Sequence, residues 1–278
     1  MKRLFDEVSK ECSKIVTQKY STSFSLGILF LDKQMRGPIY SIYGFVRFAD
    51  EIVDTFHDYD KNKLLECFGE DTFAAIENGI SMNPILNSFQ ETVHRYKISC
   101  KWVSAFLESM KTDLHKKDFC TESYGKYIYG SAEVVGLMCL HVFTEGNEKL
   151  FEHLRPFAMR LGAAFQKVNF LRDIKADNET LGRTYFPGLD LRNFSSADKK
   201  NIEKEIEIDF AEALKGIRQL PVSSRKGVYL AYRYYHALFK KIKKMQPENM
   251  MDGRIRVPNF QKIILMAKSN LDHRLNII

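Results

Sequence analysis

The chain has 278 residues, of which 45% are hydrophobic, so it is long enough to bury a large core in one or two globular domains. Its longest apolar run near the start, FSLGILFL at 24–31, is far shorter than the roughly 20 residues that cross a bilayer, and its five cysteines include no CxxC pair, which argues against a zinc site or a disulfide framework. The formal net charge of +7 favours an anionic partner, that is, nucleic acid, an anionic membrane surface or a phosphorylated small molecule.

Helical periodicity dominates the chain, and the period-two alternation typical of half-buried strands is nearly absent. Turn sequences such as RGP (36–38), with its proline at a first helical position, and TEGN (144–147) separate the predicted helices. Neither a polar linker nor an internal repeat interrupts them, so residues 1–278 are predicted to form a single all-α domain. The irregular segment 178–196 has the length of many active-site lids. The predicted helices cover about 2–19, 38–57, 61–78, 84–96, 101–116, 122–143, 148–178, 197–219, 222–245 and 258–276.

The helix predicted at 38–57 carries ionisable groups where its own pattern indicates core. At about 100° per residue, the spacing i, i+4, i+7, i+11 places Tyr43, Arg47, Asp50 and Asp54 on one narrow face. An apolar stripe that includes Phe45 occupies another face of the same helix. Little of this helix is left to contact water.

A second helix, which contains FQKVNFLRDIKAD (165–177), repeats the arrangement with Gln166, Asn169, Asp173 and Asp177 on one side. A polar stripe opposite an apolar one is also what an ordinary surface helix shows. This stripe, however, is bordered mainly by apolar and small residues, whereas a solvated face is usually rich in lysine and glutamate. We therefore expect both stripes to face the protein interior.

Buried carboxylates without partners would cost several kcal/mol each, so they require either arginine partners or a bound cation. Arg47 and Arg172 are too few to satisfy four aspartates. Oxygen ligands without histidine or cysteine suit Mg²⁺, which bridges one or two carboxylates to substrate phosphates. The two stripes therefore predict a phosphate-bearing substrate, with the arginines as phosphate ligands.

Four segments resemble, in their order and spacing, the motifs of the squalene/phytoene synthases, which join two prenyl diphosphates head to head. They are YSTSFSLG (20–27), YGFVRFADEIVD (43–54), YIYGSAEVVG (127–136) and FQKVNFLRDIKADNETLGRTYFP (165–187). The resemblance covers most of the chain. It implies an isoprenoid synthase-type helical bundle around a central cavity, with the two aspartate-rich helices facing each other across it.

The resemblance also implies the residues of the site. Two or three Mg²⁺ ions, for which Mn²⁺ can substitute, would be bound by Asp50, Asp54, Asn169, Asp173 and Asp177. Among these, the four aspartates, together with Arg47 and Tyr127, are the implied catalytic residues, and Tyr127 is a candidate for cation stabilisation or proton removal. Substrate would contact Ser21, Ser23, Phe24, Tyr43, Arg47, Gln166, Arg172, Arg183, Tyr185 and Tyr235, with Val134 and Val135 against the prenyl tails.

The family reaction passes through a cyclopropylcarbinyl diphosphate, and the chain is expected to make phytoene from two geranylgeranyl diphosphates without NADPH. The chain ends at SNLDHRLNII, without the apolar anchor of eukaryotic squalene synthases, which favours this branch. The alternative is a squalene or dehydrosqualene synthase that uses farnesyl diphosphate. A catalytically inactive assembly factor is a third reading, but both aspartate motifs are intact.

The N-terminus lacks the features of a secretory signal, so a cytoplasmic protein is expected. A hydrocarbon product must leave into lipid, which suggests peripheral contact with the inner face of the cell membrane. The basic stretch HALFKKIKK (236–244) is typical of a solvated helix end rather than of a nucleic-acid-binding surface. Basic residues are interleaved with 35 acidic ones, so no nucleic-acid partner is expected.

Overall fold

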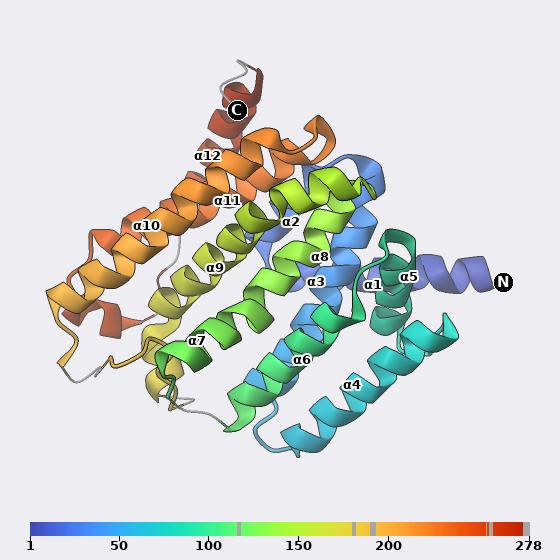
Figure 1. Ribbon diagram of the computed structural model, residues 1–278, viewed down its shortest axis with the longest axis horizontal. Helices are drawn as coiled ribbons and strands as arrows, with labels where there is room; N and C mark the ends of the chain where they lie inside the picture. Colours follow the sequence, from blue (N-terminus) through green and yellow to red (C-terminus); the bar gives the residue numbers. More distant parts are fainter. Residues whose placement is uncertain (116–117, 180–181, 190–192, 254, 256–257, 275–278) are drawn as a thin grey trace.

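The computed structural model describes residues 1–115, 118–179, 182–189, 193–253, 255 and 258–274, and within them the protein is all-α, as predicted (Figure 1). A π-helix, η1 (Tyr129–Glu133), joins α7 to α8, and a 3₁₀ helix, η3 (Glu248–Asp252), precedes α12. In this described part no helix is long and apolar enough to span a membrane. The α-helices are α1 (Lys2–Tyr20), α2 (Thr22–Leu29), α3 (Lys33–Asp54), α4 (Lys61–Asn78), α5 (Pro84–Tyr96), α6 (Cys100–His115), α7 (Thr121–Ile128), α8 (Val134–Phe143), α9 (Glu148–Glu179), α10 (Ser196–Gln219), α11 (Val222–Lys243) and α12 (Asn259–Arg274).

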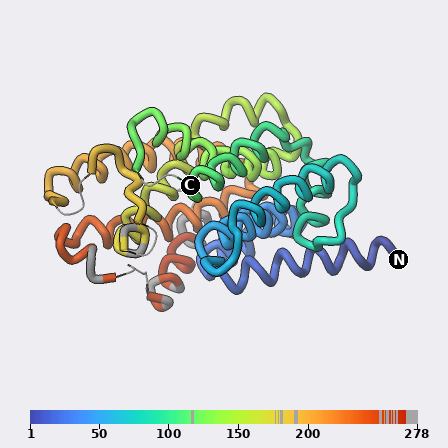
Figure 2. Tube along the Cα trace, turned by 90° about the horizontal axis from the view of Figure 1, so that it is seen from below, coloured from blue at the N-terminus to red at the C-terminus, as the bar shows by residue number. Residues whose placement is uncertain are grey.

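The helices form two layers. In one layer α4, α6, α8, α9 and α10 lie side by side in this order, and Figure 1 shows their axes tilted roughly the same way. In the other, α3 packs against α1 and α5, and α2 packs against α11. Figure 2 shows α1 along the lower edge, with its N-terminal end reaching past the other helices. Because α8 contacts both α3 and α9, it fixes the position of the two aspartate-rich helices relative to each other.

The apolar face of α3 is buried as its pattern predicts. Phe45 is fully buried and stacks on Phe89 of α5, with ring centroids 4.0 Å apart. Phe68 of α4 and Phe106 of α6 contact the same ring at 5.8 Å and 5.3 Å. These contacts hold α3 in the core, which leaves its polar stripe to face the space toward α9.

The start of α3 differs from the prediction, because the helix begins at Lys33 and contains Pro38 instead of beginning with it. A proline in the second turn removes one backbone hydrogen bond. Tertiary contacts stabilise the added turn: Met35 is fully buried, and the Asp32 N–H donates to the Ser223 carbonyl at 2.9 Å. The prediction that Pro38 opens the helix is wrong.

The sequence reading placed no element at 22–29, where the structure has α2. Ser21 caps this helix, since its Oγ accepts a hydrogen bond from the Phe24 N–H at 3.2 Å. A β-carbon added to Gly27 would lie 3.3 Å from the Gly227 carbonyl oxygen, so the backbones of α2 and α11 come unusually close. An isolated helix of eight residues would be unstable in water, so the close packing against α11, rather than local propensity, stabilises α2.

The single helix predicted at 122–143 is interrupted by η1. A β-carbon on Gly130 would lie 2.6 Å from the Ala105 carbonyl oxygen of α6. One on Gly162 of α9 would lie 2.6 Å from the Ala132 carbonyl oxygen. The backbone of η1 therefore packs closely against both α6 and α9. Single π-turns of this kind are frequent at functional sites.

Candidate active site

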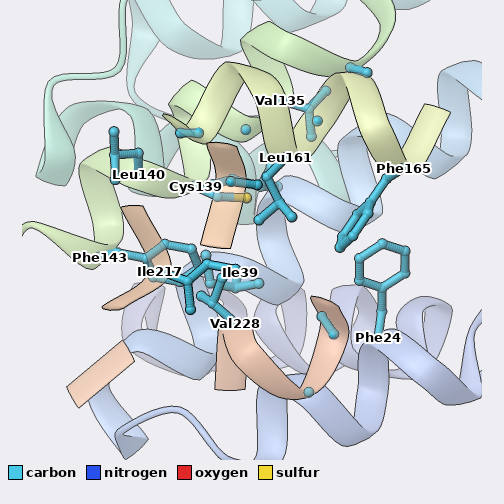
Figure 3. Close-up of a pocket in the computed structure, with 18 of the residues that line it drawn as sticks. Phe24, Ile39, Val135, Cys139, Leu140, Phe143, Leu161, Phe165, Ile217 and Val228 are labelled. Atoms are coloured by element: carbon cyan, nitrogen blue, oxygen red, sulfur yellow. The ribbon is translucent and has the colours of Figure 1, made fainter. Parts of the chain in front are cut away.

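An apolar cavity of about 290 Å³ lies between the two layers, and α2, α3, η1, α8, α9, α10 and α11 contribute to its wall. Its wall on α9 runs from Leu154 to Asn169, a stretch of about 22 Å at 1.5 Å per residue. Figure 3 shows Phe24 and Phe165 facing each other at one end, and Phe143, Ile217 and Val228 at the other. A shape this long and apolar fits a hydrocarbon chain.

The end near Phe24 is polar. Tyr43, Gln166, Asn169 and Tyr235 all line the cavity there. The Phe24 ring lies 5.7 Å from the Tyr43 ring and 5.8 Å from the Tyr235 ring. The site therefore changes from hydrocarbon to polar surface at the ring of Phe24.

The hydroxyls of Tyr43 and Tyr235 at this end are held by hydrogen bonds. Burial raises the pKa of Tyr43 to about 12, and its hydroxyl is hydrogen-bonded by Ser21. The Tyr235 hydroxyl is hydrogen-bonded by Asn169 and Arg172. Both phenols are therefore neutral and fixed in place near neutral pH.

Acidic and basic side chains meet just beyond the tyrosines. On α3, Arg47 forms ion pairs with Asp50 and Glu51, and its guanidinium lies over the Tyr20 ring, 4.3 Å from the centroid. On α9, the Arg172 Nε donates to the Asp173 carboxylate at 3.0 Å. We call the region that contains these side chains, together with Asp54, Asp177 and Arg183, the mouth of the cavity.

The carboxylates of the two helices influence one another across the mouth. The pKa of Asp177 is raised to about 7 by burial, then by Asp173 on its own helix and by Asp54 on α3. Burial and then Asp54 raise the pKa of Asp50 as well. Carboxylates of α3 and α9 therefore lie close enough at the mouth to repel one another. Asp50 and Asp54 remain accessible to a ligand, because 39% of the side-chain surface of each is exposed.

The donor set fits Mg²⁺ held in part by substrate. Asn169 lines the polar end of the cavity, and its Oδ1 atom is buried without a hydrogen-bond partner, so one oxygen ligand there is unsatisfied. In the described part of the chain no three histidine, cysteine or acidic side chains gather into a closed metal site. One or two oxygens from each helix are what Mg²⁺ takes when phosphates and water complete its coordination.

A buried cluster beside the mouth was missed by the sequence reading. Asp113 of α6 is 6% exposed and accepts hydrogen bonds from the hydroxyls of Tyr127, at 2.6 Å, and Tyr185, at 3.2 Å. The Arg183 Nη1 lies 3.2 Å from the Asp54 carboxylate and 3.2 Å from the Tyr185 hydroxyl. A signal was present, because Asp113 continues the apolar face of its helix, at i+7 from Phe106 with Met110 at i+4.

These features match those of a known family. A family model described as squalene/phytoene synthase matches residues 17–261. The chain belongs to the squalene/phytoene synthase family. The predicted resemblance is therefore confirmed, and this family consists of prenyltransferases.

The individual relatives reported below have low sequence identity to this chain. It is 25% identical to phytoene synthase 1, chloroplastic, of Solanum lycopersicum, with 95% of this chain and 68% of the relative covered. It is 26% identical to the 15-cis-phytoene synthase of Synechococcus elongatus, with 92% and 90% covered. The chain spans only 60–62% of three other plant phytoene synthases that it matches.

Two solved structures share the fold of this family member. A dehydrosqualene synthase in complex with ligand gives a TM-score of 0.81 at 19% identity and covers 97% of this chain and 98% of its own. Squalene synthase HpnC from Alicyclobacillus acidocaldarius gives a TM-score of 0.74 at 21% identity, with 86% and 94% covered. The protein therefore has the all-α isoprenoid synthase fold.

The remaining predicted site residues and the predicted lid segment lie in different parts of the structure. Val135 lines the cavity, whereas Val134 is fully buried and does not appear in the described cavity wall. Tyr127 is also absent from that wall and lies in the Asp113 cluster. Ser23 sits partly exposed in the first turn of α2. The segment 178–196 begins with the end of α9, and Tyr185 within it is buried, while 180–181 and 190–192 lie outside the described residues.

Proposed function

We propose that this protein catalyses the Mg²⁺-dependent head-to-head condensation of two geranylgeranyl diphosphates to phytoene, with release of diphosphate. The observation that carries the proposal is that a long apolar cavity opens onto a mouth where carboxylates and arginines of two helices converge. A ligand that joins a hydrocarbon chain to a diphosphate group fits both parts at once.

The first requirement of the chemistry is stabilisation of the leaving group. Ionisation of an allylic diphosphate leaves a carbocation and a growing negative charge on diphosphate. Arg47, Arg172 and Arg183 are positioned at the mouth to donate hydrogen bonds to those oxygens. Mg²⁺ would supply Lewis-acid stabilisation of the same charge when held by Asp50, Asp54, Asn169, Asp173 and Asp177.

The second requirement is that the cation reacts with the double bond of a second substrate and not with water. The apolar wall would keep water away from the cation and hold the tails of the two substrates next to each other. Phe165 stacks on Tyr235 with ring centroids 3.9 Å apart, so π-faces stand where the cation would form. The product is expected to arise through a cyclopropylcarbinyl diphosphate, with Tyr235 as a nearby cation stabiliser.

A second candidate is a squalene or dehydrosqualene synthase that uses farnesyl diphosphate. The cavity volume of about 290 Å³ lies at the lower edge of the roughly 300–1,000 Å³ of small-molecule pockets, which favours the shorter tail. The curated relatives described above are phytoene synthases, which favours the longer one. We therefore propose geranylgeranyl diphosphate, which has the longer tail, as the substrate, and we expect no requirement for NADPH.

Product identification tests the proposal. The purified full chain is incubated with Mg²⁺ and either geranylgeranyl or farnesyl diphosphate, with and without NADPH, and the hydrocarbon is identified by mass spectrometry. We expect phytoene from geranylgeranyl diphosphate without NADPH. Farnesyl diphosphate consumed only with NADPH would assign the squalene branch, and no product from either would leave a non-catalytic homologue.

Two variants locate the activity in the mouth. Asp50→Asn and Asp173→Asn remove one carboxylate charge from each helix and should each lower kcat by at least about 100-fold. Asp58→Asn is the matched control, because Asp58 is exposed four residues beyond Asp54. A loss of activity in the control as large as in the mouth variants would contradict the assignment.

Peripheral contact with the inner face of the cell membrane is part of the proposal. A linear hydrocarbon product is insoluble in water, so its release into lipid is favoured over release into solution. Sedimentation of the protein with lipid vesicles before and after turnover would test this contact.

A further inference from the structure

Asp113 is a buried carboxylate to which the proposed reaction gives no task. It lies on α6, outside both aspartate motifs, and only 6% of its surface is exposed. A buried carboxylate is costly unless its oxygens are satisfied. Here Tyr127 donates to Oδ2 at 2.6 Å, Tyr185 donates to Oδ1 at 3.2 Å, and the Arg183 Nη1 lies 3.9 Å from Oδ1.

The contacts of Asp113 join three parts of the chain. Tyr127 belongs to α7, whereas Arg183 and Tyr185 belong to the segment 182–189 that follows α9. A short β-bridge between Asp118 and Thr184 ties the same segment to the connection between α6 and α7. The segment is therefore docked onto α6 and α7 at Asp113.

The Arg183 guanidinium also reaches the mouth. Its backbone N–H donates to the Asp177 carbonyl at 2.8 Å, and its Nη1 lies 3.2 Å from the Asp54 carboxylate. The Arg183 side chain is 7% exposed, so it is desolvated and needs a counter-ion at all times. It has two candidates, the half-exposed Asp54 and the buried Asp113.

These two carboxylates have different tasks once substrate binds. Under the proposed function Asp54 binds a cation, and it then no longer neutralises Arg183. Asp113 is enclosed by tyrosines and cannot turn to the mouth, so it stays with the guanidinium. Asp54 thus becomes available to bind the cation, while Asp113 keeps Arg183 in place.

We propose that Asp113 is a positioning residue that holds Arg183 and Tyr185 at the mouth, so that Arg183 can bind the substrate diphosphate when Asp54 is engaged elsewhere. The inference rests on the proposed function for its substrate. It concerns a residue of α6 that reaches the diphosphate only through another side chain.

A double-mutant cycle with two readouts tests it. Asp113→Asn keeps the shape of the side chain and removes its charge, and Arg183→Gln removes the group on which Asp113 is inferred to act. For each variant we measure KM and kcat with geranylgeranyl diphosphate, and the affinity for inorganic pyrophosphate in the presence of Mg²⁺ by calorimetry. We expect each single variant to weaken pyrophosphate binding and raise KM about tenfold, and the double variant to be no worse than Arg183→Gln alone.

Asp209→Asn is the matched control for loss of a buried carboxylate. Asp209 is fully buried on α10 and is paired with Lys167 at 2.7 Å and Arg160 at 2.9 Å. We expect this variant to lower the melting temperature without changing KM or pyrophosphate affinity. If Asp113→Asn does not fold, Tyr185→Phe removes one hydrogen bond to the carboxylate and should change both readouts in the same direction by a smaller factor.

Two outcomes would overturn the inference: wild-type affinity for pyrophosphate in Asp113→Asn, or additive effects in the double variant. If the wild-type protein forms no hydrocarbon, the proposed function fails. The pyrophosphate measurement still decides the role of Asp113 in that case, because it needs no turnover.

Discussion

Arginines pair with part of the carboxylates at the mouth, which leaves an excess of negative charge there. A cation that binds these carboxylates must displace guanidinium groups, which are then free to turn to phosphate oxygens. Binding of metal and of diphosphate should therefore support each other. The pairs are Arg47 with Asp50, Arg172 with Asp173 and Arg183 with Asp54.

Arg47→Lys tests whether this exchange needs the planar guanidinium. Arg47 contacts Asp50 and Glu51 with two different nitrogens, and a lysine ammonium cannot reproduce that fork. We expect KM to rise about tenfold, equivalent to about 1.4 kcal/mol, with little change in stability. Steady-state kinetics check this. Arg160→Lys is the control, because Arg160 also pairs with an aspartate but lies away from the mouth and is 54% exposed, so it should leave KM unchanged.

Phe143 limits the far end of the cavity, opposite Phe24 (Figure 3). Phe143→Ala lengthens the space for a tail, while Val228→Phe shortens it. Differences of one or a few methylene groups in an apolar pocket change kcat/KM by about 10–200-fold, so we expect at least a tenfold shift toward the longer diphosphate in the first variant and toward the shorter one in the second. Competition between geranylgeranyl and farnesyl diphosphate measures the shift. Phe73→Ala, on the exposed face of α4, should leave the ratio unchanged, and equal ratios in all variants would contradict the assigned end.

At the scale of the elements, the cavity depends on how closely η1 approaches α9. A β-carbon on Gly162 would lie 2.6 Å from the Ala132 carbonyl oxygen and 3.0 Å from its carbon, and a backbone cannot yield as a flexible side chain can. Gly162→Ala should therefore reduce the free energy of unfolding by about 1–3 kcal/mol. Gly125→Ala is the control: no atom lies within 4 Å of the added carbon, and replacing a helical glycine should stabilise by about 0.5–1 kcal/mol. Denaturant unfolding of both variants distinguishes steric overlap from a general effect of alanine.

Most of the helices could be predicted from the sequence because periodicity reports burial directly. The bounds of α4 and α5 agree with the prediction, since each has an asparagine or aspartate cap and a clear apolar stripe. The helix α2 and the first turn of α3 could not be predicted, because they depend on contacts with α11, and local sequence patterns contain no information on those contacts. A π-turn such as η1 likewise has no signature in the period of its residues.

The site divides in the same way. The stripes of α3 and α9 were visible as polar residues on faces that should be buried, and the structure places both at one end of the cavity. The same reasoning applied to Asp113 would have marked it as a buried charge on α6. The partners of Asp113 could not be predicted, because the segment that contains Tyr185 has no periodicity from which to infer its docking.

The whole molecule is basic, with a net charge of +7, yet negative charge is concentrated at the mouth. This contrast has two consequences for ligands. The overall field attracts anionic substrates, whereas the mouth disfavours a bare anion until a cation is present. We therefore expect Mg²⁺ to bind before or together with the diphosphate.

The affinity for Mg²⁺ should consequently depend on pH. The pKa of Asp177 is raised from 3.8 to about 7, so its carboxyl is protonated at pH 6 and ionised at pH 8, and a cation must displace the proton at the lower value. We expect Mg²⁺ affinity to fall by up to about tenfold for each pH unit below 7, to level off above pH 8, and to be accompanied by net proton release near pH 6.5. Calorimetric titration with Mg²⁺ alone, in two buffers of different ionisation enthalpy, measures that release without a titrating phosphate in solution. Asp177→Asn should remove part of the release, whereas an affinity equal at pH 6 and pH 8 would contradict binding of Mg²⁺ by a carboxylate whose pKa is raised.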